Sequence, residues 1–331
     1  MSLFFVIDLI FLFLLMQGVG VATNTDKLRG HFQRPKGGLL VGLFCQFVVL
    51  PPLSFMVGWL YELPPIHRVA LVVTGCCPGG AMSNILCFLA RADLDLSVAM
   101  TTASSFVSIL AMPVNIYVYI TATGLADEAK LDYVSIGASA VVVVVGISFG
   151  YFVKVGADKK VSTSDDPKVH RSNNLKLRFF AVSGFMGGLA TLVIGVVKNA
   201  KSSTPAWEEE LGVYAAAESQ CLCGLFMGFS IAKLVGKLPN SSCVAVSVET
   251  SVQNIIIAMA ILNITFEEDE ERAGESMVIP MAYSALGSST ALLWLLIAMK
   301  LGLTDVEKDF SVKDVFKSYM SSVSAGGNSG G

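Results

Sequence analysis

The residues in this chain that are best suited to chemistry lie inside apolar segments. The run from Thr74 to Asn84 places Pro78, Gly79 and Gly80 in the middle of such a segment, and Ser83 follows. Pro and Gly interrupt helices. At membrane depth an interrupted backbone is tolerated where it is buried in protein or lines a water-filled cavity. Freed carbonyls and polar side chains then lie together, as an ion site requires, and this pattern indicates a transporter.

A second polar interruption surrounds Glu249, in the middle of the apolar segment 239–265. Gln253 is four residues further on and shares its face if the helix is continuous. A carboxylate at membrane depth needs a cation, a proton or a hydrogen-bond network. No Lys or Arg falls in the middle of a predicted span. A bound cation or proton is therefore expected, and the alternative is a protonated Glu249 hydrogen-bonded into helix packing.

Hydroxyl and amide groups accompany the first interruption and the segment after it. Ser97 and Thr101 are four residues apart, so that their side chains share a helix face. Oxygen ligands with one carboxylate and no thiolate or imidazole suit a hard cation such as sodium. Taken singly, each Ser or Thr could instead serve helix packing. The seven Cys and three His residues show no spacing typical of a metal or redox site.

The elements that must position these groups are membrane helices. Of 331 residues, 53% are hydrophobic and 15% are charged, whereas soluble domains carry about 25% charged residues. A span needs roughly 20 mostly apolar residues. We predict an all-α polytopic membrane protein with nine spans, at about 3–21, 37–60, 66–90, 94–121, 133–153, 177–197, 211–235, 239–265 and 275–301.

Basic residues predict the orientation. With the N-terminus outside and the C-terminus cytoplasmic, 18 of the 23 Lys and Arg residues lie inside and 5 outside. The segment 3–21 could alternatively be a cleaved signal peptide, but it lacks a basic start and Asp8 interrupts it.

Inverted repeats are common in transporters. We predict one transporter domain, 1–321, with a first repeat at about 1–121 that lacks one helix and a second at about 133–301. The two interrupted segments are then each fourth in their repeat. The Ser/Gly-rich tail, 322–331, is predicted to be disordered.

These motifs resemble the sodium/bile acid cotransporter family over about residues 10 to 300. The nine-helix layout is similar to that of its liver-type members. The residues that carry the resemblance are Pro35-Lys36-Gly37, Gln46, Gly75 to Gly80, Ser83-Asn84, Asp93 to Ser97, Met100 to Thr102, Glu249-Thr250 and Gln253-Asn254.

The resemblance implies two discontinuous crossing helices, a core domain, and a panel domain formed by spans 1, 5 and 6. It also implies two sodium sites that share Glu249. The first site would use Ser83, Asn84, Ser97, Thr101 and Glu249, and the second Gln46, Glu249, Gln253 and backbone oxygens around Thr250 and Val252. The substrate would bind beside the crossing, with Asn254 facing it.

Four features of the sequence depart from this pattern or have no place in it. Ser251 and Ala92 stand where the family usually has Gly, and Ser251 puts the second helix break and the shape of the second site in question. Asp8 and Glu218 are further acids within spans. For Glu218 the sequence leaves two alternatives, proton sensitivity or a hydrogen-bonded or cavity-facing role.

The predicted function is sodium-coupled import of an amphipathic organic anion, such as a bile acid or conjugated steroid, across the plasma membrane. The expected partners are sodium, the anion and the lipid bilayer, with no nucleic acid and no enzymatic cofactor. The alternatives are a proton-coupled carrier on the same fold and a non-transporting membrane receptor. An enzyme is not indicated, because no nucleophile–base pair or metal-ligand set occurs.

Overall fold

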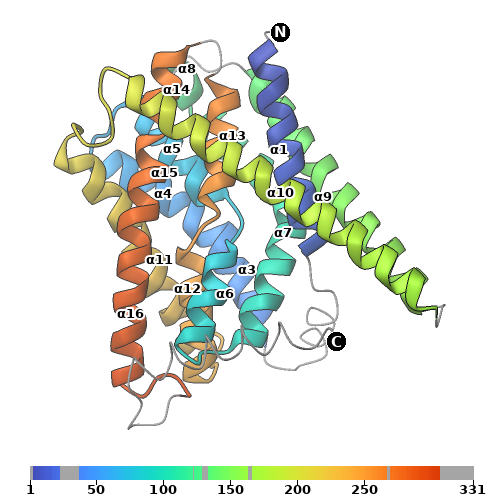
Figure 1. The fold of residues 1–331 in the computed structure, drawn as a ribbon. Helices are drawn as coiled ribbons and strands as arrows, with labels where there is room; N and C mark the ends of the chain where they lie inside the picture. Colours follow the sequence, from blue (N-terminus) through green and yellow to red (C-terminus); the bar gives the residue numbers. More distant parts are fainter. Residues whose placement is uncertain are drawn as a thin grey trace.

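The computed structural model describes residues 3–22, 37–121, 123–128, 133–162, 166–266 and 269–305. Within these ranges the chain is helical, and its only bridge between extended residues joins Gly79 and Gln253. The predicted tail, 322–331, lies outside the described residues. Figure 1 shows the arrangement of the helices.

The first half of the chain contains α1 (Leu3–Ala22), a segment made of α3 (Gly38–Phe44), the π-helical turn η1 (Cys45–Val49) and α4 (Leu50–Leu60), the pair α5 (Pro65–Cys76) and α6 (Ala81–Leu89), α7 (Leu94–Ile116) with the π-helical turn η2 (Tyr117–Thr121), and the short α8 (Leu125–Glu128). The second half contains α9 (Tyr133–Ser162), α10 (Pro167–Lys201), α11 (Leu211–Leu234), the pair α12 (Asn240–Ser251) and α13 (Ile255–Thr265), and a last segment made of α14 (Glu270–Ser276), α15 (Val278–Ala282), the π-helical turn η3 (Tyr283–Gly287) and α16 (Ser288–Lys300).

Seven helical segments in the described part of the chain are long and apolar enough to cross a membrane. Each falls on a predicted span. The two remaining predicted spans, 66–90 and 239–265, are the broken pairs α5–α6 and α12–α13, whose members are individually short. The chain is thus a multi-pass helical membrane protein.

The first break follows from the sequence. Pro78 disfavours helical geometry in the residue before it, and Cys77 is extended, with φ −68° and ψ 153°. Gly80 is also extended, and α6 begins at Ala81. The structure therefore places the interruption at the predicted position.

The second break forms without the missing glycine. Val252 (φ −95°, ψ 90°) and Asn254 (φ −80°, ψ 85°) leave the helical region with negative φ, which any residue can adopt. The Asn254 side chain caps α13 by accepting from the N–H of Ile257 at 3.4 Å. Ser251 therefore ends α12 without needing the conformational freedom of glycine.

Helices α1, α9 and α10 lie together (Figure 1), and they approach closely at glycine residues. Gly18 on α1 meets the backbone of Gly184 on α10, and Gly20 meets the backbone of α9 around Ile147 and Gly150. Small residues allow such close backbone approach between membrane helices. Asp8, one of the two unassigned acids, lies 3.6 Å from Lys198 across the α1–α10 contact. These three helices, predicted as spans 1, 5 and 6, thus form a packed group.

We expect Gly150→Ala to destabilise this group. A Cβ at Gly150 would lie 2.0 Å from the backbone oxygen of Gln17, and that backbone cannot move aside cheaply. Overpacking of this kind costs about 1–3 kcal/mol. Thermal unfolding of the detergent-solubilised protein measures the loss. Gly156→Ala on the same helix is the control, since a Cβ there meets no heavy atom within 4 Å, and equal stability of the two variants would contradict the packing described.

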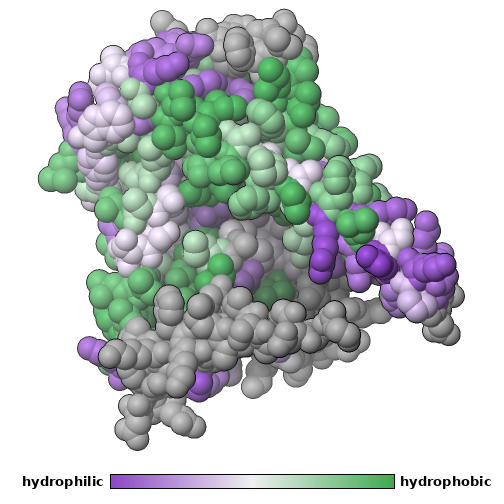
Figure 2. Space-filling view, in the orientation of Figure 1, coloured by the Kyte–Doolittle hydropathy of each residue, from purple (hydrophilic) through white to green (hydrophobic). Residues whose placement is uncertain are grey.

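Helices α9 and α10 extend beyond the spans predicted for them. Apolar side chains cover much of the visible face of the molecule, and polar ones gather at the projecting end of the α9–α10 pair (Figure 2). The exposed charges there include Lys159, Lys160, Lys168 and Arg171. The stretch between the predicted spans 133–153 and 177–197 is therefore largely helical, and residues 163–165 within it lie outside the described residues.

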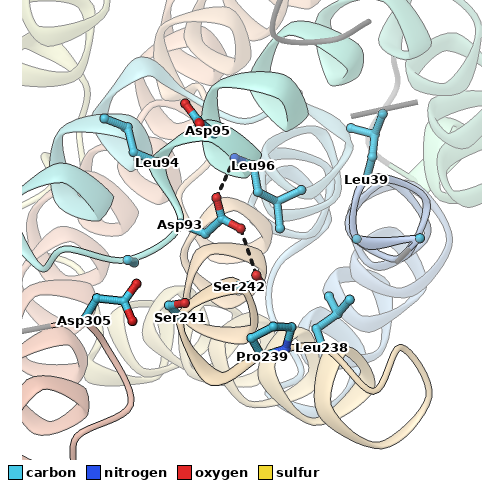
Figure 3. Close-up of a pocket in the computed structure, with 13 residues that line it drawn as sticks. Leu39, Asp93, Leu94, Asp95, Leu96, Leu238, Pro239, Ser241, Ser242 and Asp305 are labelled. Atoms are coloured by element: carbon cyan, nitrogen blue, oxygen red, sulfur yellow. Dashed lines mark hydrogen bonds between the residues drawn. The ribbon is translucent and has the colours of Figure 1, made fainter. Parts of the chain in front are cut away.

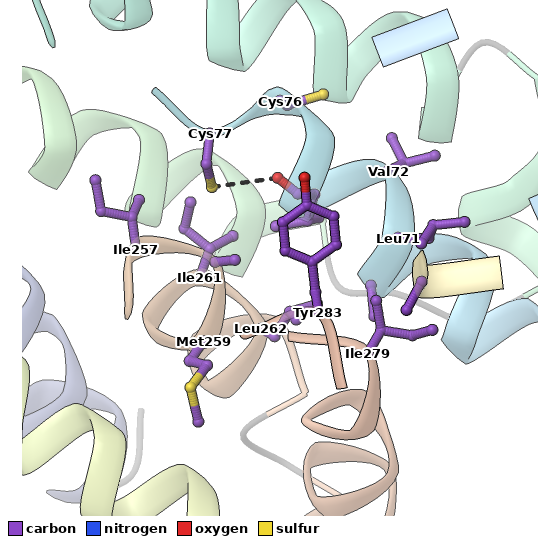
Figure 4. Packing of buried hydrophobic residues seen from close by; sticks show 14 of the residues in the cluster. Leu71, Val72, Cys76, Cys77, Ile257, Met259, Ile261, Leu262, Ile279 and Tyr283 are labelled. Atoms are coloured by element: carbon purple, nitrogen blue, oxygen red, sulfur yellow. Dashed lines mark hydrogen bonds between the residues drawn. The ribbon is translucent and has the colours of Figure 1, made fainter. Parts of the chain in front are cut away.

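A buried core joins α5, α11, α13 and α15 (Figure 4). Ile257, Ile261 and Leu262 of α13 pack here with Leu71 of α5 and Ile279 of α15. At the end of α13, Asn263-Ile264-Thr265 has the pattern of an N-glycosylation site, but Asn263 is only 1% exposed. Its amide is thus inaccessible for glycosylation in the folded protein.

Candidate functional site

The two helix breaks lie against each other. The N–H of Gly80 donates to the carbonyl of Val252 at 3.1 Å, and the N–H of Asn254 donates to the carbonyl of Pro78 at 3.0 Å. Gly79 and Gln253 form the antiparallel bridge between these bonds. Backbone groups freed by the two interruptions therefore satisfy one another, and four helix ends converge on one place.

Glu249 is buried next to this bridge, on the last full turn of α12, with 0% exposure. Its Oε2 accepts hydrogen bonds from Ser83 Oγ at 2.6 Å and Ser97 Oγ at 3.1 Å. Its Oε1 accepts from Thr101 Oγ1 at 2.6 Å. The carboxylate thus connects α12 to α6 and α7 through neutral hydroxyl groups.

Asn84 completes this cluster. Its Oδ1 accepts from Ser97 Oγ at 2.9 Å, and its Nδ2 donates to Thr101 Oγ1 at 3.1 Å. The structure therefore brings together all five side chains that the resemblance assigns to the first cation site. Whether they bind sodium is a proposal, argued below.

The second predicted set flanks Gly79 and the second break. Gln46 is 0% exposed and lies on η1, with its Nε2 3.3 Å from where a Cβ on Gly79 would lie. The same Cβ would be 2.3 Å from Glu249 Oε1. Gln253 Nε2 donates to the carbonyl of Thr250 at 2.6 Å, and the Val252 carbonyl accepts from Gly80. Gln46 and the shared carboxylate of Glu249 therefore both lie close to Gly79.

Two buried oxygens of this set, the Oε1 atoms of Gln46 and Gln253, have no hydrogen-bond partner among the described residues, and neither has Nε2 of Gln46. Among the described residues, Glu249 forms no ion pair with a Lys, Arg or His. Buried polar groups are normally satisfied, and a buried charge requires compensation. The chemistry of the site, with oxygen ligands and one uncompensated carboxylate, fits a small hard cation.

A small cavity of about 100 Å³ adjoins the crossing. Pro78, Gly79 and Asn254 line it from the breaks, Thr101 from α7, and Val19 from α1. Asn254, the predicted substrate contact, thus lies on a cavity between α1 and the crossing. Residues of the predicted cation set and of the predicted panel share its wall.

A larger pocket of about 630 Å³ lies at the first turns of α7 and α12 (Figure 3). Asp93 lines it and is held by the N–H of Leu96 at 3.0 Å and by Ser242 Oγ at 2.8 Å. Ser97, the next residue after Leu96, contacts Glu249. Leu96, which lines the pocket, is therefore the sequence neighbour of Ser97 in the cluster around Glu249. The sequence motif contained Asp93, but its contact with Ser242 depends on how α7 and α12 meet and could not be read from spacing.

Other tertiary contacts around α11 and α12 were missed for the same reason. In the last segment, Tyr283 OH donates to the carbonyl of Ser251, and Trp294 Nε1 donates to Ser247 Oγ at 3.0 Å. Buried Tyr and Trp residues usually have a polar partner, which was the available signal. Glu218, the second unassigned acid, accepts a hydrogen bond from Thr290 Oγ1.

Two broken helices that meet at a buried carboxylate define a helical membrane protein with a polar site inside its helix bundle. The family model described as Sodium Bile acid symporter family matches residues 9–204. The chain belongs to this family. It is therefore a membrane transporter and not an enzyme, and the recognition made from its motifs is confirmed.

Similar proteins extend the likeness over most of the chain. The sodium-dependent organic anion transporter of Homo sapiens is 31% identical over 280 residues, which are 85% of this chain and 69% of that protein. The ileal sodium/bile acid cotransporter of Oryctolagus cuniculus is 30% identical over 261 residues, covering 79% of this chain and 70% of that protein. The ileal sodium/bile acid cotransporter of Homo sapiens is 28% identical over 286 residues, covering 86% and 76%.

Proposed function

We propose that this protein is a sodium-coupled symporter that imports an amphipathic organic anion, in the class of bile acids and conjugated steroids. The observation that carries the proposal is the fully buried Glu249, which accepts hydrogen bonds from three neutral hydroxyls and, among the described residues, pairs with no Lys, Arg or His. A proton alone would not need this set of oxygens. The names of the similar transporters support the same coupling ion and the same class of cargo.

Two sodium ions would be transported as substrates. The first would bind between Glu249 and the oxygens of Ser83, Asn84, Ser97 and Thr101. The second would bind between Glu249, Gln46, Gln253 and the carbonyls of Thr250 and Val252. One carboxylate with two monovalent cations leaves a net positive site, which favours the charged group of the anion beside Asn254.

The coupling follows from differential affinity. Sodium neutralises Glu249 and holds the two helix breaks in the conformation that binds the anion, so that the loaded state is favoured over the empty one. The inward sodium gradient and the membrane potential then drive the change of access. Transport is electrogenic if two sodium ions accompany one monovalent anion.

The membrane arrangement completes the proposal. Nine spans result if each broken pair, α5–α6 and α12–α13, crosses once, and the two pairs then occupy equivalent places in inverted repeats of one transporter domain. The group α1, α9 and α10 acts as the panel, and the remaining helices act as the core. The basic projecting end of α9–α10 supports a cytoplasmic location for that end and an outside N-terminus. We place the protein in the plasma membrane.

Uptake measurements test this function. Cells that express the chain are given labelled taurocholate or a labelled steroid sulfate, in sodium medium and in choline medium. We expect uptake that requires sodium. Uptake that follows pH and ignores sodium would favour the proton-coupled alternative. Surface expression with no uptake and no stabilisation of the purified protein by sodium would overturn the proposal.

A further inference from the structure

Tyr283 is buried next to the second helix break, although it belongs to a different segment. It is the first residue of η3 and is 3% exposed. Its ring lies among buried side chains of α5, α13 and α15 (Figure 4). Its hydroxyl donates to the backbone carbonyl of Ser251, the last residue of α12. This hydroxyl therefore bonds the main chain at the C-terminal end of α12.

The Ser251 carbonyl needs this partner because the helix is interrupted. In a continuous helix it would accept from the N–H of Ile255, four residues further on. Here the N–H of Ile255 donates to the carbonyl of Gln253 at 3.1 Å instead. A buried carbonyl without a partner is costly, and Tyr283 supplies the missing donor.

The Ser251 peptide lies between the proposed backbone ligands of the second cation. Thr250 precedes it and Val252 follows it, and the Val252 carbonyl is itself fixed by the N–H of Gly80 at 3.1 Å. Tyr283 and Gly80 therefore hold the peptide units on the two sides of Val252. The direction in which the carbonyls of Thr250 and Val252 point depends on both bonds.

We propose that Tyr283 is a positioning residue of the second sodium site. It orients the ligand carbonyls around Ser251 and does not contact the ion. This inference rests on the proposed sodium coupling and extends it to a residue in the last helical segment.

Trp294 offers a contrast within the same segment. Its indole N–H bonds Ser247 Oγ one turn earlier on α12, at 3.0 Å. Ser247 lies inside the continuous part of α12, whose backbone approaches Gly228 of α11. Trp294 thus contacts the body of the helix, and Tyr283 contacts its end. Of these two bonds, the one from Tyr283 reaches a peptide beside the proposed ligands.

The test is Tyr283→Phe, which keeps the buried ring and removes only the hydroxyl. We expect the sodium concentration for half-maximal uptake to rise on the order of fivefold, the effect of one net hydrogen bond. Maximal uptake at saturating sodium and surface amount should stay within about twofold, because the packing of the ring is kept. The sodium concentration that half-stabilises the purified protein against heat should shift equally, and this second readout needs no knowledge of the transported anion.

Two control variants separate positioning from simple stabilisation. Tyr61→Phe removes a hydroxyl that bonds Ser219 Oγ at 2.8 Å at an exposed position at the end of α4. Trp294→Phe removes the other bond to α12. Both variants should have the same half-saturating sodium concentration as the unmodified protein, even where Trp294→Phe lowers thermal stability.

An unchanged half-saturating sodium concentration in Tyr283→Phe would overturn the inference, as would an equal shift in Tyr61→Phe or Trp294→Phe. Reduced surface amount with unchanged sodium stabilisation would also overturn it. If the unmodified protein shows neither sodium-dependent uptake nor sodium stabilisation, the proposed function itself fails, which is a distinct outcome.

Discussion

Glu249→Gln is expected to abolish sodium-dependent uptake while the protein still reaches the cell surface. Glutamine matches the shape of the Glu249 side chain. It keeps one acceptor oxygen, where the carboxylate offers one to Ser83 and one to Thr101. It removes the negative charge that would bind the cations. Removing one partner of a buried ion pair costs about 3–5 kcal/mol, which is more than about a hundredfold in affinity. Uptake measured against sodium concentration, normalised to surface amount, checks this expectation.

Glu218→Gln is the matched control, because Glu218 is another acid within a span. It accepts a hydrogen bond from Thr290 and has no contact with the helix breaks among the bonds of the described residues. We expect its sodium dependence to equal that of the unmodified protein. Unchanged sodium activation in Glu249→Gln, or its loss in Glu218→Gln alone, would show that the coupling ion does not bind at Glu249.

Gly79→Ala is expected to have the second largest effect. A Cβ at this position would lie 2.3 Å from Glu249 Oε1 and 3.0 Å from its Cδ. The carboxylate cannot move aside freely, because hydroxyls from α6 and α7 hold it. We therefore expect a stability loss of about 1–3 kcal/mol and loss of sodium-dependent uptake. Thermal unfolding with and without sodium, together with uptake, measures both effects.

Gly212→Ala serves as the control for this substitution. Gly212 lies at the start of α11, and a Cβ there would meet no heavy atom within 4 Å. Its stability and its response to sodium should match those of the unmodified protein. If Gly79→Ala also behaves normally in both measurements, the carboxylate is not held against Gly79 as described.

The fold was predictable where local chemistry decides it. Apolar length located the helices, and Pro78 located the first break, because proline acts on its own backbone and on the residue before it. The second break could not be derived in this way, since Val252 and Asn254 have no strong local reason to leave a helix. Their hydrogen bonds with Gly80 and Pro78 come from the other half of the chain. The long helical end of α9–α10 was also missed, because a polar sequence predicts a connector.

The candidate site was predictable in composition but not in detail. The residue types indicated oxygen ligands, the resemblance to the family grouped Asn84, Thr101 and Glu249 in one site, and the structure brings them into contact. Tyr283 could not be grouped with them, because its contact with Ser251 depends on tertiary packing across 32 residues of sequence. The close fit of Gly79 against Glu249 depends on packing in the same way.

The bonds that join the two breaks use only main-chain atoms: Gly80 N–H to Val252, and Asn254 N–H to Pro78. A side-chain substitution cannot delete such a bond directly, and only proline at position 80 or 254 would remove a donor. The wall of the neighbouring cavity contains Pro78, Gly79 and Asn254 of the crossing, but also side chains outside it, such as Val19 and Ser105. These outer side chains can change through mutation while the main-chain bonds of the crossing stay in place. If the anion binds in this cavity as proposed, its selection can change at the outer wall without altering the bonds that join the two breaks.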